Sequence, residues 1–162
     1  KGVRLANKAY LSQGITSLQD ATAHNGLGEW HTLQRLRERG SLVPRLSVMM
    51  GIQSLEELQD NAFSPRYGDD KVRLGALKIV LSEARGPLHP SQEELEERAL
   101  QAHRAGYQLA LHAVEESTVA AAAGALEHAA GRPADHRAAD SPDENPLGAA
   151  TDGAVAIAEG SP

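Results

Sequence analysis

Residues 76–113 read ALKIVLSEARGPLHPSQEELEERALQAHRAGYQLALHA and hold two apolar runs on either side of an amphipathic segment. The runs ALKIVL (76–81) and QLALHA (108–113) have the length and aliphatic content of β-strands. The segment 91–105 begins with serine, carries glutamate three residues later and is followed by glycine, which is the start and stop pattern of a helix. This stretch therefore predicts a strand, a crossover helix and a second strand parallel to the first.

The same pattern extends toward the N-terminus. Two more apolar runs, ITSLQD (15–20) and RLSVMM (45–50), precede the first pair, so that successive runs begin 30, 31 and 32 residues apart. This spacing suits strands that alternate with helices in an α/β protein. The segments that read as helices, besides 91–105, are 1–13, 28–39, 54–61 with Ser54 as its N-cap, and 117–130.

The two faces of the predicted strands differ in character. In 76–81 the large aliphatic residues share one face and Lys78 lies on the other, and in 108–113 the same division puts His112 opposite the leucines. We expect Leu77, Ile79, Leu109 and Leu111 to pack against helices 91–105 and 117–130. One aliphatic face and one face of small and polar residues suit a βα barrel. An open doubly wound sheet is the alternative, although it usually has apolar residues on both faces.

The predicted fold is α/β, a partial (β/α)8 TIM-type barrel with about four parallel strands and outer helices. A whole barrel takes about 250 residues, whereas this chain has 162. We therefore expect residues 1–137 to be an incomplete barrel segment that self-associates through exposed barrel edges. Residues 138–162, rich in Gly, Pro, Asp and Ala, are expected to be a disordered low-complexity tail.

Composition excludes several classes of protein. The chain has no cysteine, so thiol nucleophiles and Cys-zinc sites are impossible, and its formal net charge of −6 argues against nucleic-acid partners and anionic membranes. It contains no apolar run of ~20 residues and no signal peptide, so we expect a cytoplasmic protein with a small-molecule substrate. The phosphate-loop, dinucleotide-binding and serine-hydrolase motifs do not occur either.

Lys78 and His112 are the candidate metal ligands. A charged lysine is costly to bury in an apolar strand, and a lysine carboxylated on its amine becomes a carbamate with oxygen donors. With the neutral imidazole of His112, at the equivalent inward position of the next strand, it forms a zinc-type donor set. The alternatives are a rim lysine that reaches solvent and a histidine that packs in the core.

Four more polar residues follow these two strands. Glu83 and Arg85 lie in the loop after Lys78, where substrate contacts usually occur, and Glu115 and Glu116 could orient a metal ligand by hydrogen bonding. The alternative for the last two is a solvated helix start. We interpret the other six histidines as surface or packing residues: His24, His31, His89, His103, His128 and His136.

Three segments together resemble a known family. GITSLQDA (14–21), LKIVLSEARG (77–86) and EELEERALQAHRAGYQLALHAVEESTVAAAAGALEHA (93–129) are similar to the amidohydrolase superfamily. Within it, they resemble the amidohydrolase-3 group, which includes N-substituted formamide deformylase-like enzymes. The resemblance covers about residues 14–137. Ser82-Glu83 stands where the family usually has Asp-Gly.

The resemblance implies a metal-dependent hydrolase that acts on non-peptide C–N bonds, with a divalent metal, zinc first among the candidates. Lys78 would then be the bridging ligand, often carboxylated, and His112 the ligand from the fifth barrel strand. The family's His-x-His and its sixth-strand histidine motif do not occur in this sequence. No catalytic residue can be assigned, and we expect this chain alone to be inactive. The alternative is a non-catalytic barrel remnant or interaction module without metal.

Overall fold

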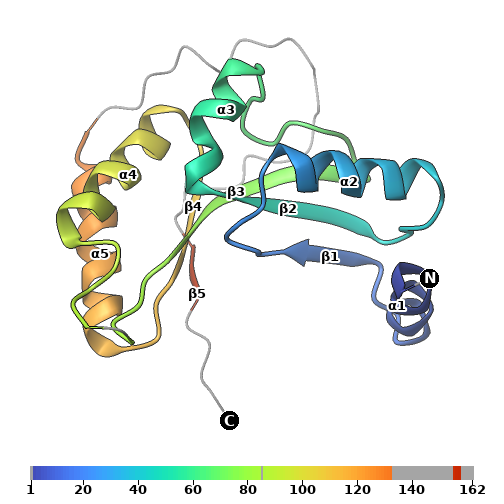
Figure 1. The fold of residues 1–162 in the computed structure, drawn as a ribbon, viewed down its shortest axis with the longest axis horizontal. Helices are drawn as coiled ribbons and strands as arrows, with labels where there is room; N and C mark the ends of the chain where they lie inside the picture. The colour runs from blue at the N-terminus through green and yellow to red at the C-terminus, as the bar shows by residue number, and fades with distance from the viewer. Residues whose placement is uncertain (1, 85, 133–154, 158–162) are drawn as a thin grey trace. The chain divides into compact units, whose positions relative to one another are not determined.

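The structure is a computed structural model that describes residues 2–84, 86–132 and 155–157 (Figure 1). Along the chain, its elements are α1 (Gly2–Ser12), β1 (Ser17–Asp20), α2 (Leu27–Glu38), β2 (Arg45–Gly51), the 3-10 helix η1 (Ile52–Ser54), α3 (Leu55–Asp60), β3 (Val72–Val80), α4 (Gln92–Arg104), β4 (Leu109–His112), α5 (Glu116–Ala130) and β5 (Val155–Ile157). None of the described helices is both long enough and apolar enough to cross a membrane.

The strand order confirms the predicted fold class. The pairs β1–β2, β3–β4 and β4–β5 are parallel, and the order in the sheet, β1-β2-β3-β4-β5, follows the order in the chain. A doubly wound sheet reverses its strand order at a switch point, and no reversal occurs among the strands that the structure describes. The topology is therefore that of a segment of an α/β TIM-type barrel, with helices between successive strands.

The chain divides into two compact units, Lys1–Ala76 and Leu77–Pro162, and the division falls inside β3. In the first unit β1 and β2 pair in register from Ser17 opposite Arg45 to Asp20 opposite Val48. The last residues of β2 are buried, as its apolar sequence predicts.

An aromatic cluster of Trp30, Phe63 and Tyr67 lies at the edge of the core of the first unit, and Tyr67 is 41% exposed. Trp30 comes from α2 and is fully buried, and its ring centroid lies 5.9 Å from that of Phe63 and 6.2 Å from that of Tyr67. Its indole Nε1 has no hydrogen-bond partner in the described part of the chain. The buried face of α2 is short, since Leu27 and Trp30 are its buried residues. Burial of the large Trp30 ring therefore stabilises this helix.

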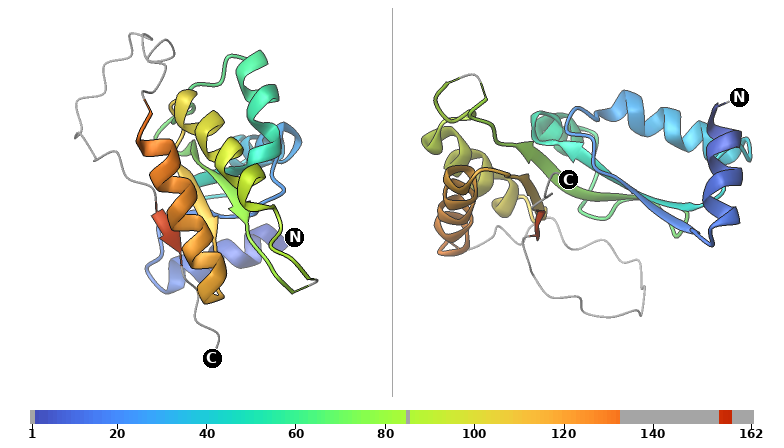
Figure 2. Two further views of the ribbon diagram at one scale, coloured as in Figure 1. Left: turned by 90° about the vertical axis from the view of Figure 1, so that its left-hand side faces the viewer. Right: turned by 90° about the horizontal axis from the view of Figure 1, so that it is seen from below.

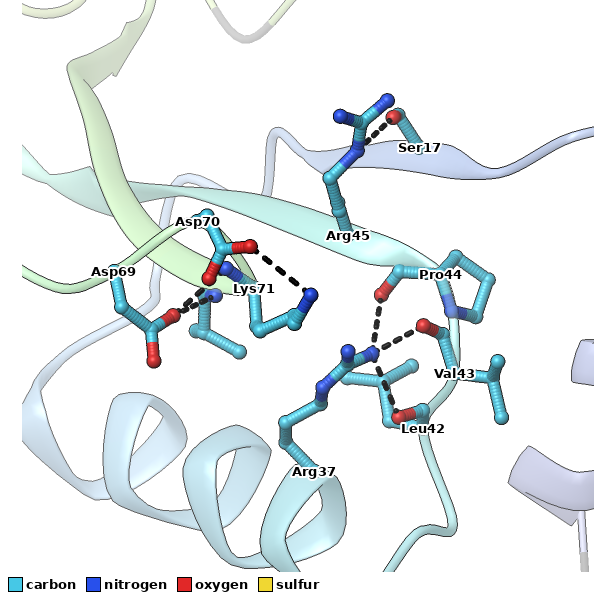
Figure 3. A network of polar contacts seen from close by, with 10 residues as sticks. Ser17, Arg37, Leu42, Val43, Pro44, Arg45, Asp69, Asp70 and Lys71 are labelled. Carbon is cyan, nitrogen blue, oxygen red and sulfur yellow. Dashed lines mark hydrogen bonds and ion pairs between the residues drawn. The ribbon is translucent and has the colours of Figure 1, made fainter.

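Polar contacts hold the segments that lead into β2 and β3 (Figure 3). The Arg37 guanidinium at the end of α2 donates to the carbonyl oxygens of Leu42, Val43 and Pro44, just before β2 begins. Asp69 Oδ1 accepts hydrogen bonds from the backbone N–H groups of Lys71 and Val72, at 2.7 and 2.8 Å. The N-terminal ends of barrel strands commonly serve stability, and these contacts fit that role.

In the second unit, α4 and α5 lie side by side in both Figure 1 and Figure 2. The predicted cap of α4 is confirmed, because Ser91 Oγ accepts a hydrogen bond from the backbone N–H of Glu94 at 3.3 Å. Gly106 has a positive φ of 76°, as its predicted role after this helix requires. The buried stripe of α5 consists of small residues, Thr118, Ala122, Ala125 and Ala129, which lets α4 approach closely.

Three expectations need correction. Ser54 does not cap a helix with its side chain. Its hydroxyl donates to the carbonyl oxygen of Asn25 at 3.1 Å instead, because that carbonyl lies buried beside it. Strand β3 begins at Val72 rather than at position 76. Within the predicted tail, Val155–Ile157 form β5, paired with β4, and the rest of 138–162 lies outside the described residues.

Candidate functional site

The two candidate ligands lie on neighbouring parallel strands of the second unit. The register of β3 and β4 places Lys78 opposite Ala110 and His112 opposite Val80. The two residues therefore share one face of the strand pair, but they are offset by two residues and are not at equivalent positions, which corrects the expectation. Because strands lie about 4.8 Å apart and rise about 3.3 Å per residue, the offset puts the two backbone positions about 8 Å apart.

The opposite face of these strands is buried, as the pattern predicts, and in the middle of the strands Lys78 and Ala110 on the first face are buried as well. Leu77, Ile79, Leu109 and Leu111 are all 5% exposed or less. At the ends of the strands the two faces differ clearly, because Val80 is 42% exposed while Ile79 is 3% exposed. The side chain of a metal ligand at this end can therefore be reached from the Val80 face.

Lys78 is buried and lacks a polar partner. It retains 5% of its accessible surface, and no hydrogen bond or ion pair joins it to another residue in 2–84, 86–132 or 155–157. A rim lysine keeps its amine in contact with solvent, and Lys78 Nζ is not among the fully buried atoms that lack a partner in the described part of the chain, so that alternative stays open. An amine that keeps contact with solvent and has no ion-pair partner among the described residues is available for chemical change.

His112 is partly exposed at the end of β4. Its carbonyl oxygen accepts a hydrogen bond from the backbone N–H of Leu81 at 2.9 Å, which fixes the backbone next to the last residue of the strand pair. The imidazole makes no hydrogen bond with the described residues. Both ring nitrogens are therefore free to bind an ion or a substrate, unlike those of a histidine that packs in a core.

The nearby carboxylates bind elsewhere. Glu83 Oε2 accepts a hydrogen bond from Ser117 Oγ at 2.7 Å, and Glu115 Oε2 lies 3.2 Å from Thr118 Oγ1. Glu116 is exposed in the first turn of α5, and Arg85 lies outside the described residues. Three of the predicted polar residues thus gather around the start of α5 rather than joining Lys78 and His112.

The donor set fits part of a metal site. Among the residues that the structure describes, no group of three or more His, Asp or Glu side chains could hold a metal ion. Lys78 and His112 would supply one imidazole and, after carboxylation, one oxygen ligand, whereas zinc sites use three or four protein ligands. The two residues are therefore suited to be two ligands of a larger set.

Sequence reasoning missed the role of Thr118. Its side chain is fully buried, and its hydroxyl accepts from the backbone N–H of Val114 at 3.1 Å and donates to the carbonyl oxygen of Glu115 at 2.7 Å. A threonine in the first turn of a predicted helix is an ordinary capping signal. That signal alone could have drawn attention to the hydroxyl, but not to its bond with the preceding loop.

Two other histidines link helices. His103 Nε2 lies 2.9 Å from the carbonyl oxygen of Arg132, and His128 Nδ1 lies 3.7 Å from Glu96 Oε2. They join α4 to α5 and to the segment after it. The packing interpretation of these two residues agrees with these contacts.

Comparison with known proteins gives a family and a fold. The sequence pattern of the amidohydrolase family matches residues 1–151. Two crystal structures are similar in fold, those of uncharacterized metal-dependent hydrolases from Pyrococcus furiosus and Pyrococcus horikoshii OT3. The first has a TM-score of 0.66 at 19% identity and matches 78% of this chain. The second has a TM-score of 0.65 at 17% identity and matches 81% of this chain.

This chain spans 30% of the length of each of those two structures. No curated protein matches the chain. At these identities the likeness concerns the fold, and it agrees with the strand order described above.

Proposed function

Because the chain belongs to the amidohydrolase family, we propose that it carries part of the metal site of a hydrolase that acts on non-peptide C–N bonds of a small molecule. The observation that carries this proposal is the pair Lys78 and His112. They lie on one face of adjacent parallel strands, and neither side chain has a polar partner among the described residues. The two similar structures are of metal-dependent hydrolases, which supports the same kind of site.

Lys78 would act after carboxylation. Its amine nitrogen forms a bond to the carbon of carbon dioxide and releases one proton, so that a carbamate with two oxygen donors replaces the amine. Burial at 5% exposure protects such a group from bulk water. The change replaces an amine that has no polar partner among the described residues with a group that can bind a metal through its oxygens.

His112 would hold the metal through a ring nitrogen, and Glu83 and Glu115 would fix the loops around it. A divalent metal bound there, zinc first among the candidates, supplies Lewis acidity for hydrolysis. The Glu83 and Glu115 side chains already contact the first turn of α5. Their part is to orient the segments that carry the ligands rather than to bind the metal.

We expect the chain alone to be inactive. Two ligands are fewer than the three or four of a catalytic zinc site, so the remaining ligands must come from another segment or another polypeptide. Exposed strand edges, such as that of β1, give the chain a means of self-association.

A non-catalytic interaction module is the second candidate. It is favoured by the lack of any group of three metal-binding side chains within the described residues. Such a module would keep the strands and helices of the barrel segment while Lys78 stays an unmodified amine.

Carbon-13 NMR separates the two candidates. The chain is incubated with 13C-labelled bicarbonate, with and without zinc ions, and the spectrum is searched for a carbamate signal. The hydrolase proposal expects a signal that Lys78→Met abolishes and Lys71→Met retains, since Lys71 is an exposed lysine paired with Asp70. It also expects zinc to shift the His112 imidazole signals more than those of the exposed His24. No carbamate and no His112 response would favour the module.

A further inference from the structure

The first turn of α5 carries two adjacent hydroxyl groups that bind two different loops. Ser117 binds the loop that follows β3, and Thr118 binds the loop that follows β4. These loops come directly after the strands of Lys78 and His112.

Thr118 uses its hydroxyl fully. The group accepts one hydrogen bond, from Val114 N, and donates its single proton to the carbonyl oxygen of Glu115, with Glu115 Oε2 as a second acceptor at 3.2 Å. The side chain has no exposed surface. A buried hydroxyl that lost both partners would be costly, so these bonds define the path of residues 113–115.

The hydroxyl of Thr118 is turned toward the preceding loop rather than toward the helix. No side-chain hydrogen bond caps α5 at Glu115, and Val114 N, which Thr118 binds, lies outside the helix. Stabilising the helix alone would not require this bond. What the bond does fix is the backbone two residues after His112.

His112 is therefore held on both sides. Leu81 N donates to the His112 carbonyl oxygen at 2.9 Å within the strand pair, and Thr118 Oγ1 accepts from Val114 N at 3.1 Å beyond it. Between the two bonds lies Ala113, which is 4% exposed. The backbone that carries the imidazole has little freedom to rotate.

The loop after β3 is held in a similar way. Ser82 and His89 exchange two backbone hydrogen bonds of 3.0 Å in an isolated antiparallel bridge, which joins the two ends of the loop. Glu83, the residue after Ser82, accepts from Ser117 Oγ at 2.7 Å. The same turn of α5 thus contacts the segments that follow both candidate ligands.

We propose that Thr118 is a positioning residue for His112, which it holds in a metal-binding orientation through Val114, and that Ser117 supports the neighbouring loop through Glu83. This inference rests on the proposed function, since it assumes that His112 binds a metal. Hydrogen bonds that orient a metal ligand typically change metal affinity about 10–100-fold when they are lost, and Thr118 would act in this way on the backbone of His112 rather than on its imidazole.

The test compares Thr118→Val, which keeps the shape and removes the hydroxyl, with Thr118→Ser, which keeps the hydroxyl. Val119→Thr is the matched control, because it makes the reverse change at an exposed position of the next residue. NMR follows zinc titration of the His112 imidazole and hydrogen exchange of the Val114 amide. We expect Thr118→Val to weaken zinc binding about 10-fold or more and to expose the Val114 amide. Thr118→Ser and Val119→Thr should stay close to the wild type.

Several results would overturn the inference. One is a Thr118→Val variant whose His112 signals, zinc affinity and Val114 exchange all match the wild type. Another is a Thr118→Ser variant as impaired as Thr118→Val, which would assign the effect to packing of the methyl group. If Thr118→Val does not fold, hydrogen exchange of the wild-type chain decides. A wild-type Val114 amide that exchanges as fast as an amide without a hydrogen bond contradicts the proposed role of Thr118.

The metal-free readouts separate this inference from the proposed function. If wild-type His112 does not respond to zinc and Lys78 gives no carbamate signal, the proposed function fails. The role of Thr118 is then judged by the Val114 amide and by the side-chain rotamer of His112 in Thr118→Val. If the His112 rotamer and the exchange rate of the Val114 amide are unchanged in Thr118→Val, the positioning role of Thr118 is rejected. If both change in Thr118→Val and return to the wild-type values in Thr118→Ser, the role is supported.

Discussion

At position 78 an amine occupies a place where β3 would otherwise carry an aliphatic side chain. The strand buries Lys78 to 5% exposure without a hydrogen bond or ion pair from the described residues. The methylene groups of Lys78 are buried, whereas its Nζ is not among the fully buried atoms without a partner in the described residues and keeps contact with solvent. A lysine retained under these conditions is suited to a chemical role, at the expense of stability.

Lys78→Met should therefore stabilise the chain in buffer free of bicarbonate. Methionine has a similar length and no charged group that burial would partly remove from water, so we expect the free energy of unfolding to rise by about 1 kcal/mol. Urea unfolding followed by far-UV circular dichroism measures the change. The control Lys71→Met should stay within about 0.5 kcal/mol of the wild type, because its ion pair with Asp70 is exposed. A Lys78→Met variant less stable than the wild type would show that the amine has a stabilising partner.

At the start of β3, the Asp69 carboxylate makes stability depend on acid pH. The backbone N–H groups of Val72 and Lys71 lower the pKa of Asp69 below its ordinary 3.8, with a smaller contribution from the Arg37 charge. The unfolded chain then binds a proton more readily than the folded chain. The stabilisation is complete above the unfolded pKa and is lost as pH falls through the lower folded value.

Asp69→Asn should accordingly be less stable than the wild type near neutral pH, and this difference should shrink as pH falls below about 4. Urea unfolding across pH 7 to 3 measures the difference. Asp70→Asn is the comparison, since that carboxylate faces Lys71 Nζ and not backbone N–H groups. A difference that grows toward acid pH would contradict the assignment.

At the scale of whole elements, α5 contains one replaceable glycine. Gly124 lies inside the helix, and a Cβ added there would meet Gln92 Nε2 at 3.5 Å, which is an ordinary contact. We expect Gly124→Ala to stabilise the chain by about 0.5–1 kcal/mol, because alanine loses less backbone entropy on folding. Thermal unfolding measures the gain.

Gly106 provides the opposite control. Its φ of 76° is one that a residue with a Cβ adopts at a cost, so Gly106→Ala should destabilise the chain by about 1 kcal/mol. If both glycine variants change the free energy of unfolding in the same direction, either Gly124 does not lie inside α5 or Gly106 does not have a positive φ after α4.

Periodicity predicted which elements form but not how they are aligned. The alternation in 76–81 and 108–113 was sufficient to divide the residues between two faces, because side chains alternate along a strand. It left the register open, since a shift of two residues keeps every face unchanged. The expected alignment of Lys78 with His112 was wrong for this reason, because in the structure Lys78 lies opposite Ala110.

The start of β3 was missed for a different reason. Gly75 interrupts the apolar run, and glycine usually weakens a strand. In the structure a Cβ at this position would come within 2.9 Å of Ser47 Oγ and 3.4 Å of the Val48 carbonyl oxygen. The close approach of β2 requires glycine here, and an approach between distant segments is not visible in a local pattern.

At the scale of the molecule, β1 is the last strand on one side of the sheet order. Apolar side chains are exposed near it, among them Ile15 at 39% and Val43 at 48%. Unpaired strand edges and exposed apolar groups favour association between copies. The proposed self-association therefore has a specific location in the first unit.

Light scattering after size-exclusion chromatography should give a mass above the monomer's 17.2 kDa that rises with protein concentration. Ile15→Lys should lower this mass toward the monomer, since a charge beside the edge opposes pairing. Val119→Lys, on α5, is the control and should leave the mass unchanged. A monomer at every concentration would rule out self-association.

The aromatic rings are unevenly divided between the two units. The first unit holds four of the five, including the single tryptophan, and Tyr107 is the only ring in the second. Tryptophan fluorescence therefore reports on residues 1–76 alone, whereas far-UV circular dichroism senses the helices of both units. Unfolding curves from the two signals that coincide would show that the units unfold together. Curves that separate would give the stability of each unit in one titration without cutting the chain.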